Sequence, residues 1–131
     1  MPKVFLGGTC NNSQWRDNLI LTLNIDYFNP VVDDWTPECQ QREVKERETA
    51  DYVLYTVTKE MAGVYSIAEA VDDSNKRPEK TVFCVLKDGF DEGQLRSLDA
   101  VAQMVQRNGG KVFDNLKEVA EYLNKAALAA S

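Results

Sequence analysis

The 131-residue sequence contains no histidine, and this absence excludes several kinds of active site. Without imidazole, the chain cannot form a Ser-His-Asp triad or a zinc site that mixes cysteine and histidine ligands. Acid–base chemistry would have to use aspartate, glutamate, tyrosine or lysine side chains. Carboxylates are therefore the first candidates for any catalysis, and we expect neither a metal nor a cofactor.

Cysteine is also scarce, and long hydrophobic runs are absent. The three cysteines, Cys10, Cys39 and Cys84, include no pair at CxxC spacing. An odd cysteine count, no signal peptide and no apolar run of about 18 residues predict a reducing, soluble, cytoplasmic setting.

Positive charge is never clustered in this chain. The net charge is −6, and no run of lysine or arginine exceeds two residues. Duplex nucleic acid and anionic membranes both favour clustered positive charge, so we expect neither as a partner. A small nucleotide is still possible, because it needs only a few backbone N–H groups and one or two cations.

Five short apolar runs alternate with longer amphipathic stretches. They predict strands at 3–6, 25–28, 51–57, 81–86 and 111–113, and helices at 13–23, 37–49, 62–73, 92–107 and 115–127. Such alternation is typical of a parallel sheet with helices on both faces. Right-handed crossovers favour a flavodoxin-like three-layer α/β sandwich with strand order 2-1-3-4-5, in which residues 1–131 form a single domain.

In this topology a ligand binds where the strand order reverses, between the first and third strands. The pocket should form from residues 7–15 and 56–66, with the loop "VVDDW" as a further wall. Gly7 and Gly8 would let the backbone approach a ligand, although "GGTCNNS" also fits an ordinary turn with Asn12 or Ser13 as helix cap. Trp15 and Trp35 could stack on a base or a sugar, or serve only as core or rim residues.

Several carboxylates lie on segments that could face this pocket: Asp33, Asp34, Glu43, Asp51, Glu60 and Glu69. With 21 acidic residues in the chain, most must simply be solvated. Glu69 differs because apolar residues flank it in the least polar helix. A carboxylate in that setting is expected to be partly buried, and so to need a partner or a function.

The block "ETADYVLYTVTKEMAGVYSIAEAV", together with the opening "KVFLGG", resembles the nucleoside 2-deoxyribosyltransferase family and the related deoxynucleoside 5'-monophosphate N-hydrolases. The resemblance implies a nucleoside or nucleotide as small-molecule ligand, and a homo-oligomer. It also implies a nucleophilic glutamate on the helix after the third strand. That glutamate attacks the anomeric carbon of deoxyribose, and the glycosyl-enzyme intermediate passes to another base or to water.

The position of that glutamate is the point where this sequence departs from the family. Aligning Asp51, Thr58 and Gly63 without gaps puts Ile67 at the nucleophile position, whereas Glu69 lies two residues further on. Two residues turn a helix by about 200°, so only a shifted helix start would restore the direction of the side chain. The same register places Glu43 where the family has an aspartate that lines the site.

Three hypotheses follow from the sequence. The first is an enzyme that cleaves or transfers an N-glycosidic bond, with Glu69 as nucleophile and Glu43 or Glu60 as further catalytic candidates. The second is a nucleotide-binding module of the same fold that has lost the nucleophile, and the third is an assembly subunit. The expected substrate-binding residues are Gly7, Gly8, Ser13, Trp15, Arg16, Asp51, Thr58, Gly63 and Ser66.

Overall fold

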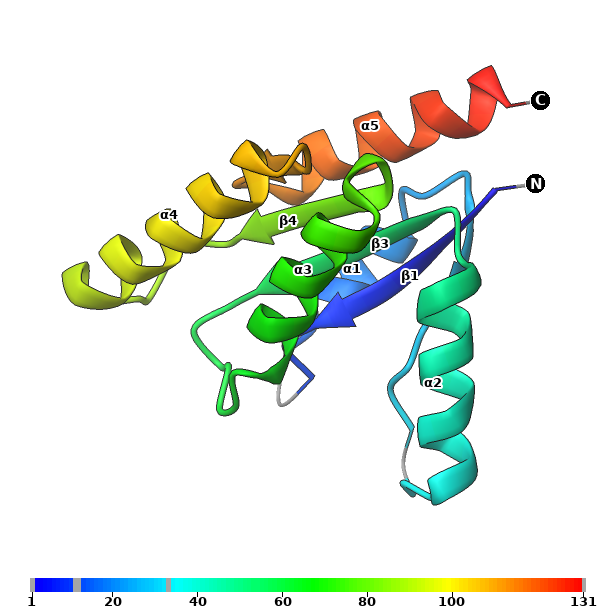
Figure 1. Ribbon diagram of the computed structural model, residues 1–131, viewed down its shortest axis with the longest axis horizontal. Helices are drawn as coiled ribbons and strands as arrows, with labels where there is room; N and C mark the ends of the chain where they lie inside the picture. Colours follow the sequence, from blue (N-terminus) through cyan, green and yellow to red (C-terminus); the bar gives the residue numbers. More distant parts are fainter. Residues whose placement is uncertain (1, 11–12, 33, 131) are drawn as a thin grey trace.

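The computed structural model describes residues 2–10, 13–32 and 34–130. Five strands form one parallel sheet in the order β2-β1-β3-β4-β5 (Figure 1). They are β1 (Lys3–Gly8), β2 (Asp26–Phe28), β3 (Tyr52–Val57), β4 (Thr81–Val85) and β5 (Lys111–Phe113). The flavodoxin-like fold and the strand order expected from the sequence are confirmed.

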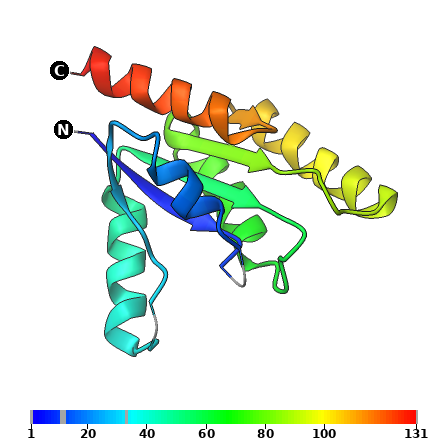
Figure 2. The same cartoon turned by 180° about the vertical axis from the view of Figure 1, so that it is seen from behind.

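Helices cover both faces of the sheet, which is why the strands read as nearly continuous apolar runs. On one face, α1 (Trp15–Ile20) and α5 (Leu116–Ala129) pack over alternate strand residues such as Leu6 (Figure 2). On the other face, α3 (Tyr65–Lys76) and α4 (Glu92–Arg107) cover residues such as Phe5 (Figure 1). None of the described helices is long and apolar enough to cross a membrane.

Helix α2 (Pro37–Thr49) is placed differently from the other helices. None of its 13 residues, all of them described, is buried, and it runs away from the sheet in both views (Figures 1 and 2). Thr36 caps it, since its side chain accepts a hydrogen bond from the Cys39 N–H at 3.2 Å. Because α2 lies away from the edge of the sheet, one of its faces borders the space beyond the carboxyl ends of the strands.

Helices α1 and α3 begin two or three residues later than the sequence predicted. Helix α1 starts at Trp15, and its cap residue is Gln14 rather than Ser13; Asn12 lies outside the described residues. Helix α3 starts at Tyr65 instead of residue 62. Residues 58–64 instead form an extended turn, in which the Met61 N–H donates to the Thr58 carbonyl at 3.0 Å. The exposed Gly63 disfavours helix at this point.

Gly8 brings the end of β1 close to β3. It pairs with Thr56 in the strand register and has a φ of +112°, a conformation that side chains other than glycine rarely adopt. A Cβ atom added at Gly8 would lie 2.6 Å from the Thr56 backbone nitrogen and closer still to its carbonyl oxygen. Because backbone cannot move aside as a side chain can, the position accepts only glycine.

We therefore expect Gly8→Ala to lower the free energy of unfolding by more than about 1 kcal/mol, as substitutions at incompatible φ do. Gly63→Ala is the matched control, because a Cβ atom there meets no atom within 4 Å. Thermal unfolding of both variants checks the prediction. Equal melting temperatures for the two variants would contradict the close approach of β1 and β3.

Candidate active site

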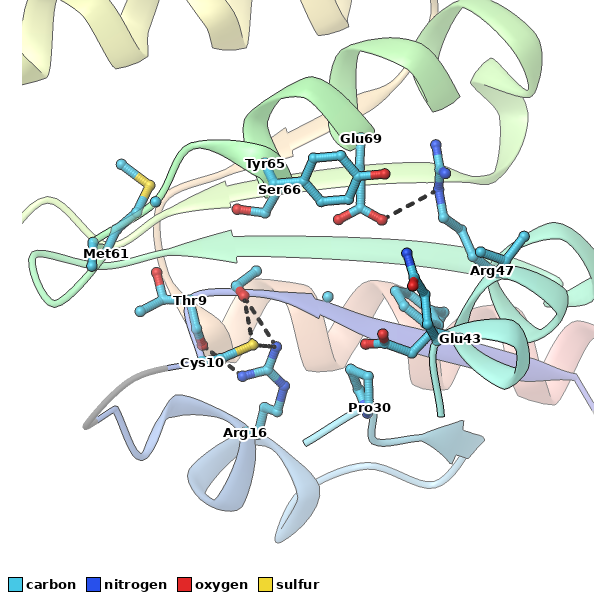
Figure 3. A pocket seen from close by; sticks show the side chains of 17 residues that line it. Thr9, Cys10, Arg16, Pro30, Glu43, Arg47, Met61, Tyr65, Ser66 and Glu69 are labelled. Carbon is cyan, nitrogen blue, oxygen red and sulfur yellow. Dashed lines mark hydrogen bonds and ion pairs between the residues drawn. The ribbon is translucent and has the colours of Figure 1, made fainter. Parts of the chain in front are cut away.

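A cavity of about 270 Å³ opens where β1 and β3 end, at the reversal of strand order (Figure 3). Its walls come from five regions: the end of β1 with the turn after it, α1, the loop after β2, α2, and α3 with its preceding turn. The lining residues are Phe5, Gly7, Gly8, Thr9, Cys10, Arg16, Pro30, Gln40, Glu43, Val44, Arg47, Met61, Ala62, Gly63, Tyr65, Ser66 and Glu69.

Most of the site residues expected from the sequence meet in this cavity, namely Gly7, Gly8, Arg16, Glu43, Gly63, Ser66 and Glu69. Others do not line it. Trp15 is 3% exposed and donates its indole N–H to the Thr9 carbonyl at 2.9 Å, so its ring belongs to the core. Trp35 is an exposed rim residue.

The remaining expected residues do not line the cavity either. Asp51 precedes β3 at the opposite end of the sheet, where its carboxylate accepts the Lys3 backbone N–H at 2.9 Å. Thr58 is buried, and its hydroxyl donates to Glu60 at 3.3 Å. Glu60 and Ser13 are partly exposed but are not among the residues that line the cavity. Asp33 lies outside the described residues.

The late start of α3 decides which of its side chains point into the cavity. Ser66 and Glu69 stand one turn apart and both line it, as Figure 3 shows. Ile67 packs instead against the core between α3 and the sheet. The ungapped position of the family's nucleophile therefore faces away from the cavity, and the carboxylate two residues further on faces into it.

Glu69 has an unusual electrostatic environment. Its side chain is only 19% exposed, and its Oε2 lies 3.7 Å from Arg47 Nε (Figure 3). Burial raises the pKa of Glu69 to about 7, opposed by Arg47 and reinforced by the carboxylates of Asp73 and Glu43. Near neutral pH the group therefore changes readily between its acid and carboxylate forms.

Glu43 lines the cavity from α2, across from α3 (Figure 3). Burial raises its pKa, and the nearby Arg16 guanidinium opposes that effect. The cavity thus holds two carboxyl groups from different helices, both of which bind a proton more tightly than a free glutamate does. Such a pair can divide the roles of nucleophile and acid.

Arg16 holds the turn after β1 in place. The side chain is buried, and its guanidinium donates to the carbonyls of Leu6 at 2.9 Å, Thr9 at 2.6 Å and Gly8 at 3.3 Å. It also lies 4.5 Å from the centre of the Trp15 ring. These contacts fix the backbone that faces the cavity, so this arginine shapes the wall of the site.

Arg47 and Tyr65 also line the cavity but were not named among the candidate site residues, although Tyr65 lies in the segment 56–66 that was expected to form the pocket. Each stands four residues from a predicted site residue on the same helix: Arg47 follows Glu43, and Tyr65 precedes Glu69. Residues at this spacing share a helix face. Scanning one turn either side of each candidate carboxylate would therefore have found both of them.

The fold and the site together define an α/β protein with a carboxylate-lined cavity at the switch point of its sheet. A sequence model of the family described as nucleoside 2-deoxyribosyltransferase like matches residues 1–89. The chain therefore belongs to this family. The matched residues include β1 to β4 and every described residue that lines the cavity. No curated protein matches the sequence.

The raised pKa of Glu69 has a consequence for stability. Its ordinary value is 4.5, so between about pH 4.5 and 7 the folded protein keeps a proton that the unfolded chain has lost. Stability that depends on this group is therefore lost as the pH rises through that window. Glu69→Gln, which cannot ionise, should match the wild type below pH 4.5 and exceed it above pH 7 by on the order of 2–3 kcal/mol.

Denaturant unfolding of the two proteins at pH 4, 6 and 8 measures this difference. Glu121→Gln, on the exposed side of α5, is the matched control and should show no such pH dependence. A Glu69→Gln variant less stable than the wild type at pH 8 would contradict the environment described for Glu69.

Proposed function

We propose that this protein cleaves or transfers the N-glycosidic bond of a 2'-deoxynucleoside or its 5'-monophosphate, with Glu69 as nucleophile. The observation that carries the proposal is a mostly buried carboxylate directed into the switch-point cavity of a chain whose family is named for deoxyribosyl transfer between nucleosides. Family membership by itself supports the broader class of glycosyl transfer or hydrolysis.

The proposed reaction has two steps. First, a Glu69 carboxylate oxygen forms a bond to C1' of the deoxyribose, and the C1'–N bond breaks with its electron pair leaving on the base. We assign Glu43, whose pKa burial raises, the role of giving the base its proton. In the second step, water or another base bonds to C1', the Glu43 carboxylate takes the proton that this nucleophile loses, and Glu69 leaves as a carboxylate. Deoxyribose favours this route because it lacks the 2'-hydroxyl group that would disfavour the cationic transition state.

The walls of the cavity suit the two parts of such a ligand. Gly7 and Gly8 present bare backbone, which a sugar can approach closely. Tyr65 lies beside Glu69 in Figure 3 and is 73% exposed, so its ring is free to stack on a base. Ser66 adds a hydroxyl group one turn from Glu69. We assign these residues to substrate binding.

The direct test measures base release by chromatography from a panel of deoxynucleosides and their 5'-monophosphates. We expect the wild type to release base from at least one of them and Glu69→Ala to lose this activity by at least about 1,000-fold, a barrier increase near 4 kcal/mol. Glu121→Gln is the matched control and should keep full activity.

The other results would lead to different conclusions. If Glu69→Ala still released base, the nucleophile would have to be another carboxylate, with Glu43 and Glu60 as the candidates. No release by the wild type from any compound would reject the enzyme and favour a nucleotide-binding module. Adding a second free base to an active mixture separates the two reactions, because a transferase then forms a new nucleoside and a hydrolase does not.

The pH dependence of activity gives an independent test. A nucleophilic Glu69 must be ionised, so the rising limb of the kcat/KM profile should have its midpoint near the pKa of about 7 that burial gives this group, with a fall at higher pH once Glu43 loses its proton. An ordinary exposed glutamate would give a midpoint near 4.5. Initial rates between pH 4 and 9 on the best substrate of the panel decide between the two midpoints.

A further inference from the structure

A cluster of charged groups lies next to Glu69 and takes no part in the bond changes proposed above. At its centre is Asp73, which is fully buried on α3. Its carboxylate accepts the Tyr55 hydroxyl at 2.6 Å, Arg47 Nε at 3.1 Å, a terminal Arg47 nitrogen at 3.1 Å and Arg77 Nη1 at 3.0 Å. These bonds join β3, α2 and the end of α3.

Arg47 is held more firmly than an arginine on an exposed helix usually is. Asp73 binds its guanidinium through both carboxylate oxygens, the geometry that best fixes an arginine. The guanidinium also donates to the Tyr55 hydroxyl at 3.0 Å and to Asp72 at 3.0 Å. Only 15% of the side chain is exposed, so the charge is fixed at the edge of the cavity.

The contact between Arg47 and Glu69 is an ion pair without a hydrogen bond, unlike the contacts of Arg47 with Asp73, Asp72 and Tyr55. At 3.7 Å, Arg47 Nε is close enough for a strong electrostatic attraction but too far for a hydrogen bond. The guanidinium donates its hydrogen bonds to Asp73, Tyr55 and Asp72, which leaves the lone pairs of Glu69 free to attack a carbon atom. The same positive charge favours the return of Glu69 to a carboxylate when the sugar leaves.

The charged groups that act on Glu69 come from several elements. Arg47 and Glu43 belong to α2, and Asp73 lies one turn further along α3. Tyr55 from β3 is neutral and holds its proton tightly, because burial and Asp73 raise its pKa. Arg16 of α1 acts on Glu43. Among the described groups that act on Glu69, Arg47 is the one cation, set against two carboxylates.

We propose that Arg47 is a positioning residue for Glu69, fixed by the buried Asp73–Tyr55 pair, and that its charge keeps Glu69 an ionised, unbonded nucleophile. The inference rests on the proposed function, because that function gives Glu69 the role of nucleophile. Without Arg47, a partly buried Glu69 beside two other carboxylates would remain protonated at neutral pH.

The test is a carbon NMR titration of the Glu69 carboxyl group in the ligand-free protein, with its signal assigned by its loss in Glu69→Gln. Arg47→Gln should raise the pKa of Glu69 by about one pH unit or more, because it removes the attracting charge. Asp73→Asn should lower that pKa, because it removes a repelling charge while the asparagine amide oxygen, Tyr55 and Asp72 still accept hydrogen bonds from the guanidinium. Glu121→Gln, on the exposed side of α5, is the control and should leave the pKa nearly unchanged.

The sign of the change separates an electrostatic role from a structural one. A variant that merely loosens the site exposes Glu69, and its pKa then falls toward the ordinary value. To allow for a poorly folded Arg47→Gln variant, the same substitution is also made in the Asp73→Asn background, where no buried carboxylate is left without its partner. The pKa of Glu69 should rise from Asp73→Asn to the double variant.

A fall or no change at that step would overturn the proposal, as would a Glu121→Gln effect as large as that of Asp73→Asn. If the wild type releases base, the midpoint of its pH–rate profile should move upward in Arg47→Gln by the same amount as the pKa. A wild type that releases no base, combined with the expected titrations, would reject the nucleophile and leave the electrostatic role of Arg47 supported. The two failures are therefore distinguishable.

Discussion

The geometry of the site depends on one buried ion cluster, in which Asp73 binds Arg47, Arg77 and the Tyr55 hydroxyl. A buried carboxylate loses its hydration, and it is tolerated only where partners satisfy its oxygens, as they do here. Helix α2 contributes no buried residue, so apolar packing does not fix its position. The salt bridge between Lys3 and Glu46 at 2.9 Å and the bonds of Arg47 attach it instead. The placement of Glu43 in the cavity follows from these polar contacts.

This arrangement differs from the rest of the molecule, where apolar packing sets the geometry. Strands β1, β3 and β4 are buried on both faces, and the two cores on either side of the sheet fix α1, α3, α4 and α5. Those cores place the carboxyl ends of β1 and β3 side by side, as the parallel topology requires. The core thus defines where the cavity lies, and the polar cluster defines which charges face into it. A cost in stability from partly buried carboxylates is expected in a site of this kind.

The sequence predicted the apolar core well and the polar cluster around Asp73 poorly. Alternating apolar runs and helical periodicity identify buried strands and amphipathic helices locally, so the strand order and the bounds of α2, α4 and β5 agree with the structure. The Asp73 cluster could not be read in this way, because its partners lie 18 and 26 residues away along the chain. In "VDDSNK" this aspartate resembles a solvated helix residue. The core position of Trp15 could not be predicted for a related reason, because closeness to the pocket along the sequence does not show which way a ring points.

The start of α3 shows how a small local difference relocates a functional group. The end of β3 and the axis of α3 are fixed by core packing, so the length of the turn between them determines where the helix begins. Helix α3 accordingly starts at Tyr65, with Ile67 on its core face and Glu69 on its cavity face. Under the proposed function, an alignment that permits no gap compares a core residue of this chain with a catalytic residue of its relatives. On the same proposal, a shift of two residues in the turn at 58–64 aligns Glu69, and not Ile67, with that catalytic residue.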